Sequence, residues 1–257
     1  MDGLVEAAVR AVCTVVVPCY NEEARLPVAR FQAFLSQTEG IRFLFVNDGS
    51  RDGTLAMLEE LAAGYGDRVA VLDKQPNGGK AEAVRVGMAQ AIAEGESAYV
   101  GFWDADLATP LDAIPDFLSH MAVRPQIEMV FGARVALLGR HIERKPMRHY
   151  LGRAFATLAS MMLRLPIYDT QCGAKIFRVT PDFSAVVAQP FQSRWIFDVE
   201  IIARFLDLHP NDVLHVRNVI YEFPLREWRD VGGSKVRSVD FFLALGELLR
   251  IRRRYFR

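Results

Sequence analysis

Two carboxylates one residue apart, Asp104 and Asp106, follow an apolar run at residues 98–103. The run predicts a buried strand, and carboxylates at the end of a parallel strand lie at the crevice where open α/β sheets bind ligands. A pair with this spacing can hold a hard cation such as Mg²⁺ or Mn²⁺ and leave coordination positions for substrate phosphates. The pair therefore indicates metal-assisted chemistry on a phosphorylated substrate, although Asp-x-Asp also occurs in ordinary loops.

Two further turns offer groups suited to a nucleotide. Residues 17–22, Val-Pro-Cys-Tyr-Asn-Glu, present backbone N–H groups, an aromatic ring and a carboxylate at the end of a β-branched run. Residues 77–80, Asn-Gly-Gly-Lys, allow close backbone approach, and the amine of Lys80 would reach a phosphate. Taken alone, each turn is explained equally well as an ordinary loop.

A third turn, residues 46–53, follows an apolar run at 43–46. Together with Glu59, residues of this turn nearly match a calcium-binding loop, namely Asp48, Ser50, Asp52 and Gly53. That loop requires a preceding helix, whereas residues 43–46 predict a strand. We therefore expect Asp48 to face a nucleotide base, and Ser50 or Asp52 to cap the next helix.

Strands and helices alternate through the first half of the chain. Apolar and β-branched runs predict strands at residues 12–18, 43–46, 69–72, 98–103 and 128–132. Capped or amphipathic segments predict helices at residues 21–37, 52–63, 80–94 and 110–121. This alternation is typical of an α/β fold with a doubly wound, mostly parallel sheet and flanking helices.

The pattern changes after Arg134. We expect a helix at 144–165, a polar turn and short strand at 169–178, a helix at 197–208, a β-rich segment at 213–223 and an amphipathic helix at 239–257. No internal repeat or linker is visible. One domain, residues 1–257, with a C-terminal amphipathic helical elaboration is therefore the expected organisation.

Composition limits the classes of partner. The chain holds 31 Lys+Arg and 31 Asp+Glu, and its basic residues are concentrated at 250–257, so we expect no nucleic-acid partner. Three dispersed cysteines without metal-ligand spacing fit a reduced, cytoplasmic chain. No apolar run approaches the roughly 18 residues needed to span a bilayer, so we expect membrane contact to be peripheral.

Four motifs, in this order, resemble the family 2 glycosyltransferases with the GT-A fold. They are Pro-x-Tyr-Asn-Glu at 18–22, Asn-Asp-Gly-Ser-x-Asp-Gly-Thr at 47–54, Asn-Gly-Gly-Lys at 77–80 and Asp-Ala-Asp at 104–106. Segments at 169–175, 194–200 and 233–235 are similar to the dolichyl-phosphate β-glucosyltransferases and, more widely, to polyprenyl-phosphate glycosyltransferases. The resemblance implies a nucleotide-sugar-binding half at 12–134, an acceptor-side half at 135–237 and a basic amphipathic helix at 238–257.

The resemblance implies a role for each matching residue. The nucleoside would be bound by Pro18, Tyr20, Glu22 and Asp48. Mg²⁺ or Mn²⁺ and the donor diphosphate would be held by Asp104 and Asp106, with Ala105 close to the ribose. Lys80 would belong to the nucleotide-binding residues, and phosphates would be met by Arg134, Arg148, Arg153, Ser234 and Lys235. The catalytic candidates are Asp106, Asp169, Arg134 and Arg148.

Three residues of the second half are candidates for binding the sugar: Gln171, Trp195 and Asp198. Trp195 would stack on the ring, although a packed core Trp is an equally good interpretation. Asp169 and Asp198 would bind hydroxyls, orient an arginine or act as a base. The structural alternatives are a turn cap for Asp169 and a first-turn helix acid for Asp198.

Two departures from the family pattern affect the substrates. Ala108 stands where the mannosyltransferases place a Gln that ligates the metal, which weakens the case for mannose. The eukaryotic glucosyltransferases carry an N-terminal membrane anchor, whereas this chain begins almost directly at the first strand. We therefore expect a prokaryotic relative that uses an undecaprenyl-type lipid.

The resemblance implies a nucleotide sugar, first of all UDP-glucose, as donor and a polyprenyl or dolichyl phosphate as acceptor. A phosphate monoester has a second pKa of about 6, so it requires cations rather than a base. Attack opposite the diphosphate would invert the anomeric carbon. Three alternatives stay open: a GDP-mannose-dependent mannosyltransferase, a transferase for a hydroxyl acceptor that needs Asp169 as base, and a non-catalytic nucleotide-sugar-binding protein.

Residues 144–165 and 241–257 both combine apolar and arginine faces. Such helices suit the surface of an anionic bilayer, and a helix packed on the sheet with a solvated tail is the alternative. We favour contact with the cytoplasmic face of a membrane, because a lipid acceptor must be reached at the bilayer surface.

Overall fold

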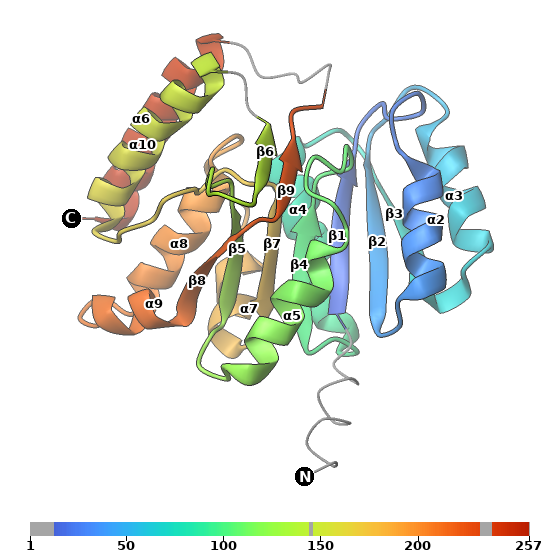
Figure 1. The fold of residues 1–257 in the computed structure, drawn as a ribbon, viewed down its shortest axis with the longest axis horizontal. Coiled ribbons are helices and arrows are strands. Elements are labelled where there is room, and N and C mark those ends of the chain that lie inside the picture. The colour runs from blue at the N-terminus through green and yellow to red at the C-terminus, as the bar shows by residue number, and fades with distance from the viewer. Residues whose placement is uncertain (1–12, 144–145, 232–237, 257) are drawn as a thin grey trace.

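A seven-stranded sheet with strand order β3-β2-β1-β4-β7-β5-β8 lies at the centre of the molecule (Figure 1). Its strands are β1 (Cys13–Cys19), β2 (Ile41–Asp48), β3 (Val69–Lys74), β4 (Tyr99–Trp103), β5 (Met129–Ala133), β7 (Ala174–Arg178) and β8 (Ile220–Pro224). A separate parallel pair joins β6 (His141–Glu143) to β9 (Glu227–Arg229). The computed structural model describes residues 13–143, 146–231 and 238–256, except the side chains at 146–149 and 238–242.

The order of the strands fixes where a ligand can bind. Strands β3, β2, β1 and β4 are mutually parallel. The chain moves outward from β1 to β3 and then returns to place β4 on the other side of β1. Open α/β sheets bind ligands beyond the carboxyl ends of their strands at such a reversal. The loops that follow Cys19 and Trp103 are therefore the expected walls of the site.

Helices cover both faces of the sheet (Figure 1). They are α2 (Val28–Gln37), α3 (Thr54–Ala63), α4 (Lys80–Glu94), α5 (Ala113–Val123), α6 (Pro146–Leu163), α7 (Pro181–Ala188), α8 (Phe197–Leu208), α9 (Val213–Val219) and α10 (Ser238–Tyr255), with a short 3₁₀ turn at Gly66–Arg68. Side chains alternate across a strand. On β2, Phe43 and Phe45 therefore pack with α2 and α3, while Leu44 and Val46 pack with α4.

The first helix begins later than predicted. We expected it to start at Asn21, but α2 begins at Val28. Pro27 directly precedes it, and the residue before a proline is kept out of the helical region, so a helix cannot run through this point without distortion. Residues 21–27 form turns instead.

Two further corrections fall in the second half. The segment 213–223 was expected to be β-rich throughout, but its first part is α9, where the side chain of Asp212 accepts the N–H of His215 at 2.8 Å and caps the helix. Helix α7 was not predicted, although Thr180 caps it through the N–H of Phe183 at 3.1 Å.

The α/β class and the mostly parallel sheet are confirmed. Of the described strands in this sheet, only β7 runs antiparallel to its neighbours, and it lies between β4 and β5. The sequence predicts β7 as a strand but not its place in the sheet. Within residues 13–143, 146–231 and 238–256, no helix is both long and apolar enough to cross a bilayer.

Candidate active site

The loops after β1 and β2 are joined by hydrogen bonds. Thr54 Oγ1 accepts the N–H of Glu22 at 2.8 Å, and Asn21 Oδ1 accepts the N–H of Arg51 at 2.9 Å. Asn21 has a φ of 52°, a left-handed conformation that Asn tolerates better than most residues. These bonds fix the turn that carries the predicted nucleoside-binding residues Tyr20 and Glu22 beside the carboxyl end of β2.

Asp48 holds the glycine loop that precedes α4. Its carboxylate is 2% exposed and accepts the N–H groups of Gly78 at 2.8 Å and Gly79 at 2.7 Å. The amine of Lys74 lies 3.0 Å from the same carboxylate. The contact of Asp48 with a base stays a prediction, and the structure adds a positioning role, because this loop leads directly into Lys80.

Asp104 and Asp106 follow β4 in a partly open site beside Lys80. The amine of Lys80 forms an ion pair with Asp104 Oδ1. Burial and the neighbouring charge of Asp104 raise the pKa of Asp106. Burial by itself would lower the pKa of Lys80, but the charges of Asp104, Asp198 and Asp106 raise it above its usual value. The site thus places two acids, which can bind a cation, beside the amine of Lys80, which can bind a phosphate. A diphosphate with a bound cation requires both kinds of group.

Gly173 gives Asp104 the space it occupies. The N–H of Asp104 donates to the carbonyl oxygen of Gly173 at 2.9 Å. A Cβ atom on Gly173 would overlap the carboxylate of Asp104. Any larger residue at position 173 must therefore displace the first acid of the pair.

Lys175 and Asp198 form a buried ion pair below the site. The amine of Lys175 lies 2.5 Å from Asp198 Oδ1 and donates to the carbonyl oxygen of Cys172 at 2.5 Å. The amine also lies 5.2 Å and 5.1 Å from the ring centroids of Phe102 and Phe131. Burial raises the pKa of Asp198, and the charge of Lys175 opposes this shift. The position of Asp198 indicates a structural role as counter-ion of Lys175.

Arg134 and Asp169 form a second closed pair. The Nε and Nη2 groups of Arg134 donate to Asp169 Oδ2 at 2.6 Å and Oδ1 at 2.7 Å, and its backbone N–H donates to Oδ2 at 3.1 Å. The N–H of Asp169 donates to Glu222 Oε1 at 2.7 Å. The guanidinium of Arg134 lies 5.2 Å from the ring centroid of Trp228. Asp169 therefore orients the arginine, one of the roles expected for it.

Two of the remaining sugar and phosphate candidates lie next to the Arg134–Asp169 pair. Arg153 donates to the carbonyl oxygen of Tyr168 at 2.7 Å and stacks on its ring at 3.7 Å. The N–H of Gln171 donates to Asp169 Oδ1 at 3.1 Å. Trp195 is 44% exposed, so its interpretation as a packed core residue is wrong.

Other candidates are located less fully. Pro18 lies near the end of β1 and is half-buried, and Ala105 is buried between the two acids. Arg148 belongs to α6, but its side chain lies outside the described residues, as do Ser234 and Lys235. The roles of these residues stay predictions.

Comparison with models of protein families shows the family to which the chain belongs. The model of "Glycosyl transferase family 2" matches residues 14–183. The chain belongs to glycosyl transferase family 2. This confirms the family predicted from the motifs, and the match includes the loops that follow β1, β2, β3 and β4.

Similar proteins in this family are the dolichyl-phosphate β-glucosyltransferases. That of Homo sapiens is 31% identical over 266 residues, covering 94% of this chain and 75% of the relative. That of Drosophila melanogaster is 32% identical over 247 residues, covering 91% and 72%. That of Saccharomyces cerevisiae is 28% identical over 267 residues, covering 94% and 74%.

Solved structures show the same fold. Glucosyl-3-phosphoglycerate synthase from Mycobacterium tuberculosis, in complex with UDP, superposes with a TM-score of 0.62 at 18% identity, covering 98% of this chain and 84% of that chain. Its complex with Mn²⁺, UDP-glucose and phosphoglyceric acid superposes with a TM-score of 0.61 at 17% identity, covering 96% and 82%. The GT-A fold predicted for this family 2 member is thereby confirmed.

The two acids after β4 fit a shared metal ion. Among the described residues, no three His, Cys, Asp or Glu side chains gather as a complete metal cage. Mg²⁺ is commonly held by one or two carboxylates together with substrate phosphates and water. The oxygens of Asp104 and Asp106 fit such an ion, and the same ligands suit Mn²⁺.

Three residues important to the site were not singled out from the sequence. Lys175 could have been found, because a lysine inside the apolar strand Ala-Lys-Ile-Phe must have a buried partner. Glu222 carries a similar signal inside Ile-Tyr-Glu-Phe-Pro. Gly173 carries none, because only the position of Asp104 shows why a side chain is excluded.

Proposed function

We propose that this family 2 glycosyltransferase moves glucose from UDP-glucose to a polyprenyl or dolichyl phosphate, with inversion of the anomeric carbon. The names of the similar glucosyltransferases support this lipid acceptor and this sugar. The UDP-glucose in a structural neighbour supports the donor. The buried free cysteines fit a reducing compartment, so we place the protein on the cytoplasmic side.

One observation carries the choice of acceptor. The amine of Lys80 pairs with Asp104, and the charge of Asp104 also acts on Arg134. Asp169 is bonded to Arg134 and Asp198 to Lys175. Both carboxylate oxygens of Asp169 accept hydrogen bonds from Arg134, and Asp198 is bound to the buried amine of Lys175, so neither acid is placed to take a proton from an acceptor hydroxyl. A phosphate acceptor requires no strong base, so this arrangement favours it over a hydroxyl acceptor.

Each group then has a defined task. A divalent ion bound to Asp104 and Asp106 would supply charge neutralisation for the departing diphosphate. Lys80, at the N-terminus of α4, binds a donor phosphate with the help of the helix dipole. Arg134, fixed by Asp169, brings the acceptor phosphate towards the anomeric carbon against the repulsion of the donor phosphates. The phosphate oxygen forms the new bond as the bond to the diphosphate breaks on the opposite side.

A transfer assay tests the proposal. Purified protein with Mg²⁺ or Mn²⁺ is incubated with labelled UDP-glucose, UDP-N-acetylglucosamine, UDP-galactose or GDP-mannose, and with either polyprenyl phosphate or phosphoglyceric acid. We expect label from UDP-glucose in the lipid product. Transfer from GDP-mannose alone would assign a mannosyltransferase, and transfer to phosphoglyceric acid alone would establish a hydroxyl acceptor.

Two variants control this assay. Asp106→Asn removes an acid of the site, and Asp112→Asn removes an exposed acid nearby in sequence. We expect only the first variant to lose transfer. Nucleotide-sugar binding without transfer or hydrolysis in the unmodified protein would instead identify a non-catalytic binding protein.

A further inference from the structure

Glu222 of β8 holds the irregular segment that joins α6 to β7. Its Oε1 atom accepts the N–H groups of Tyr168 at 2.9 Å and Asp169 at 2.7 Å, and its Oε2 atom accepts the N–H of Tyr168 at 2.8 Å. Backbone N–H groups of a partly buried irregular segment need partners that no helix or strand supplies. One carboxylate therefore fixes two consecutive residues of this segment.

Each of these two residues holds an arginine. Asp169 accepts two hydrogen bonds from the guanidinium of Arg134, at 2.6 Å and 2.7 Å. The carbonyl oxygen of Tyr168 accepts a hydrogen bond from Arg153 at 2.7 Å, and the guanidinium of Arg153 lies 3.7 Å from the centroid of the Tyr168 ring. Both arginines are candidates for binding the acceptor phosphate. Glu222 is thus connected to both of them through one short stretch of backbone.

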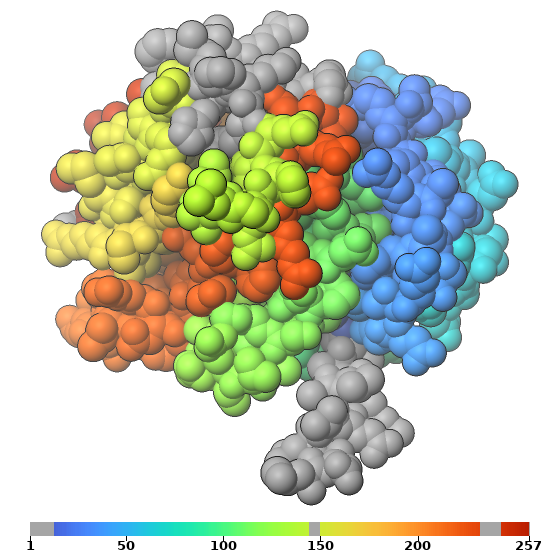
Figure 2. Space-filling view, in the orientation of Figure 1, coloured from blue at the N-terminus to red at the C-terminus, as the bar shows by residue number. Residues whose placement is uncertain are grey.

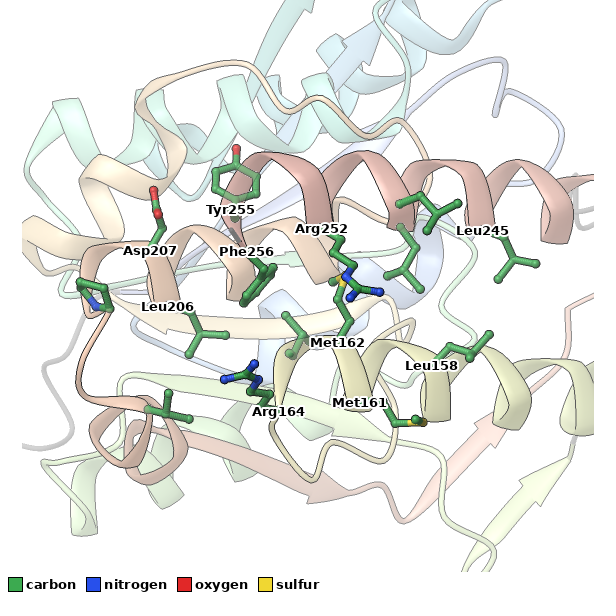
Figure 3. Close-up of a pocket in the computed structure, with 15 residues that line it drawn as sticks. Leu158, Met161, Met162, Arg164, Leu206, Asp207, Leu245, Arg252, Tyr255 and Phe256 are labelled. Carbon is green, nitrogen blue, oxygen red and sulfur yellow. The ribbon is translucent and has the colours of Figure 1, made fainter.

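The two arginines come from different parts of the fold. Arg134 directly follows β5, and β5 pairs with β8 in the central sheet. Arg153 belongs to α6, which packs against α10 and α8 (Figure 3) and forms part of the surface of the molecule (Figure 2). Glu222 lies opposite Phe131 of β5 in the sheet. The segment that Glu222 holds therefore links Arg153 of the outer helix to the strand that leads to Arg134.

The charge of Glu222 is suited to fixing backbone. Burial raises its pKa, the N–H groups of Tyr168 and Asp169 oppose this shift, and the nearby charge of Asp169 adds to it. A carboxylate makes shorter and stronger hydrogen bonds to N–H groups than a neutral acceptor does. Both oxygens of Glu222 accept bonds from the protein itself, so this residue can act on a ligand only through its neighbours.

We propose that Glu222 is a positioning residue for the acceptor phosphate. By holding Tyr168 and Asp169, it sets the guanidinium groups of Arg153 and Arg134 so that both meet the same phosphate. Cations that are already in place bind a phosphate without first losing the freedom of their side chains. The predicted donor residues lie in the loops after β1, β2, β3 and β4, so Glu222 should affect the acceptor far more than the donor. This inference rests on the proposed function, which assigns a phosphate acceptor to the site.

Kinetics with a water-soluble, short-chain isoprenyl phosphate test the role of Glu222. Glu222→Gln keeps the shape of the residue, but it removes the charge and puts an NH₂ group where an oxygen now accepts an N–H. We expect KM for the acceptor to rise about tenfold, within the range for residues that act on a site through packed neighbours, while kcat and the Kd for UDP stay within about twofold. An unchanged KM for the acceptor would overturn the proposal. Equal losses of acceptor and UDP binding would overturn it as well, because they would show a general structural role.

A matched control and double variants identify the route of the effect. Glu128→Gln changes an acid that directly precedes β5, at the opposite end of that strand from Arg134, and it should alter none of these values. When Glu222→Gln is added to Asp169→Asn or to Arg153→Met, the further rise in KM should be smaller than its effect alone, since residues of one network are not additive. Full additivity in both double variants would mean that Glu222 acts through neither arginine, and it would overturn the proposal.

Binding measurements separate this inference from the proposed function. Calorimetry with the same isoprenyl phosphate, in the presence of UDP, reports acceptor binding without transfer. Weaker binding by Glu222→Gln than by an unmodified protein that transfers no glucose would remove the proposed function and leave the positioned phosphate site. Glucose transfer with the same KM for the acceptor in both proteins would leave the proposed function and overturn the role of Glu222.

Discussion

The acids after β4 and the acids of the second half have similar chemistry and different surroundings. Asp104 and Asp106 stand in a partly open site, and Asp104 is paired with an amine that is itself partly exposed. Asp169 and Asp198 are buried, and each is bonded to an enclosed cation. The comparison shows that two properties of an acid indicate its role better than its distance from the site: its bonding partner and its exposure. Partly exposed acids are available to bind substrate, whereas buried acids bonded to a cation support the structure of the site.

Removing Asp198 should have the largest effect, and on stability. Asp198→Ala leaves the fully buried amine of Lys175 without its counter-ion, a change that costs about 3–5 kcal/mol in comparable buried pairs. Urea unfolding measures the loss. Replacing both partners, in Lys175→Met/Asp198→Leu, should restore most of it. A stable but inactive Asp198→Ala protein would instead place Asp198 among the substrate-binding residues.

Removing either acid of the open pair should affect catalysis instead. We expect Asp104→Asn and Asp106→Asn each to lower kcat/KM at least about a hundredfold, the size of effect seen when one group that stabilises developing charge is lost. Their urea midpoints should stay close to that of the unmodified protein, because neither acid is a buried counter-ion. A large loss of stability in Asp104→Asn would contradict the comparison.

Gly173 tests whether the position of Asp104 matters as well as its charge. In Gly173→Ala the new methyl group displaces the Asp104 carboxylate, and we expect about a tenfold fall in kcat/KM, since small misplacements at a reacting centre are costly. Gly246→Ala is the control, because a Cβ there meets nothing within 4 Å. Equal activity of the two variants would show that Asp104 can move without consequence.

The sequence was sufficient to predict the open pair, Asp104 and Asp106. It was insufficient to predict the closed ion pairs, Arg134–Asp169 and Lys175–Asp198. Asp104 and Asp106 were predicted because a strand followed by two acids is a local pattern, and the parallel sheet then determines where they lie. The pairing of Lys175 with Asp198 was not, because it depends on β7 entering the sheet between β4 and β5 in the antiparallel sense. Residues that are far apart in the sequence and meet only through tertiary packing have no characteristic spacing, so their pairing cannot be predicted from the sequence.

Asp169 should show a moderate effect that separates orientation from base catalysis. Asp169→Asn keeps the shape of the residue but removes the charge that holds Arg134. We expect KM for the phosphate acceptor to rise about tenfold, the lower end of what the loss of a hydrogen bond to a charged group costs, while the pH profile of kcat keeps its form. If Asp169 were the base, kcat would fall by about a hundredfold or more and its dependence on ionisation of this acid would disappear.

Lys80 should give the smallest effect, with opposite signs for two ligands. Its amine and a divalent ion would compete for the same oxygen of Asp104, yet the amine would also bind the donor diphosphate. In Lys80→Met we therefore expect tighter binding of Mn²⁺ alone and weaker binding of UDP, both measured by calorimetry. Each change should be about two- to fivefold, because the ion pair is partly exposed and screened by solvent. Lys74→Met removes a neighbouring amine that is bonded to Asp48, and it should not strengthen Mn²⁺ binding. Weaker binding of both ligands in Lys80→Met would mean that Lys80 supports the acids rather than competing with the metal. The open pair would then resemble the closed pairs, in which a cation is a fixed part of the structure.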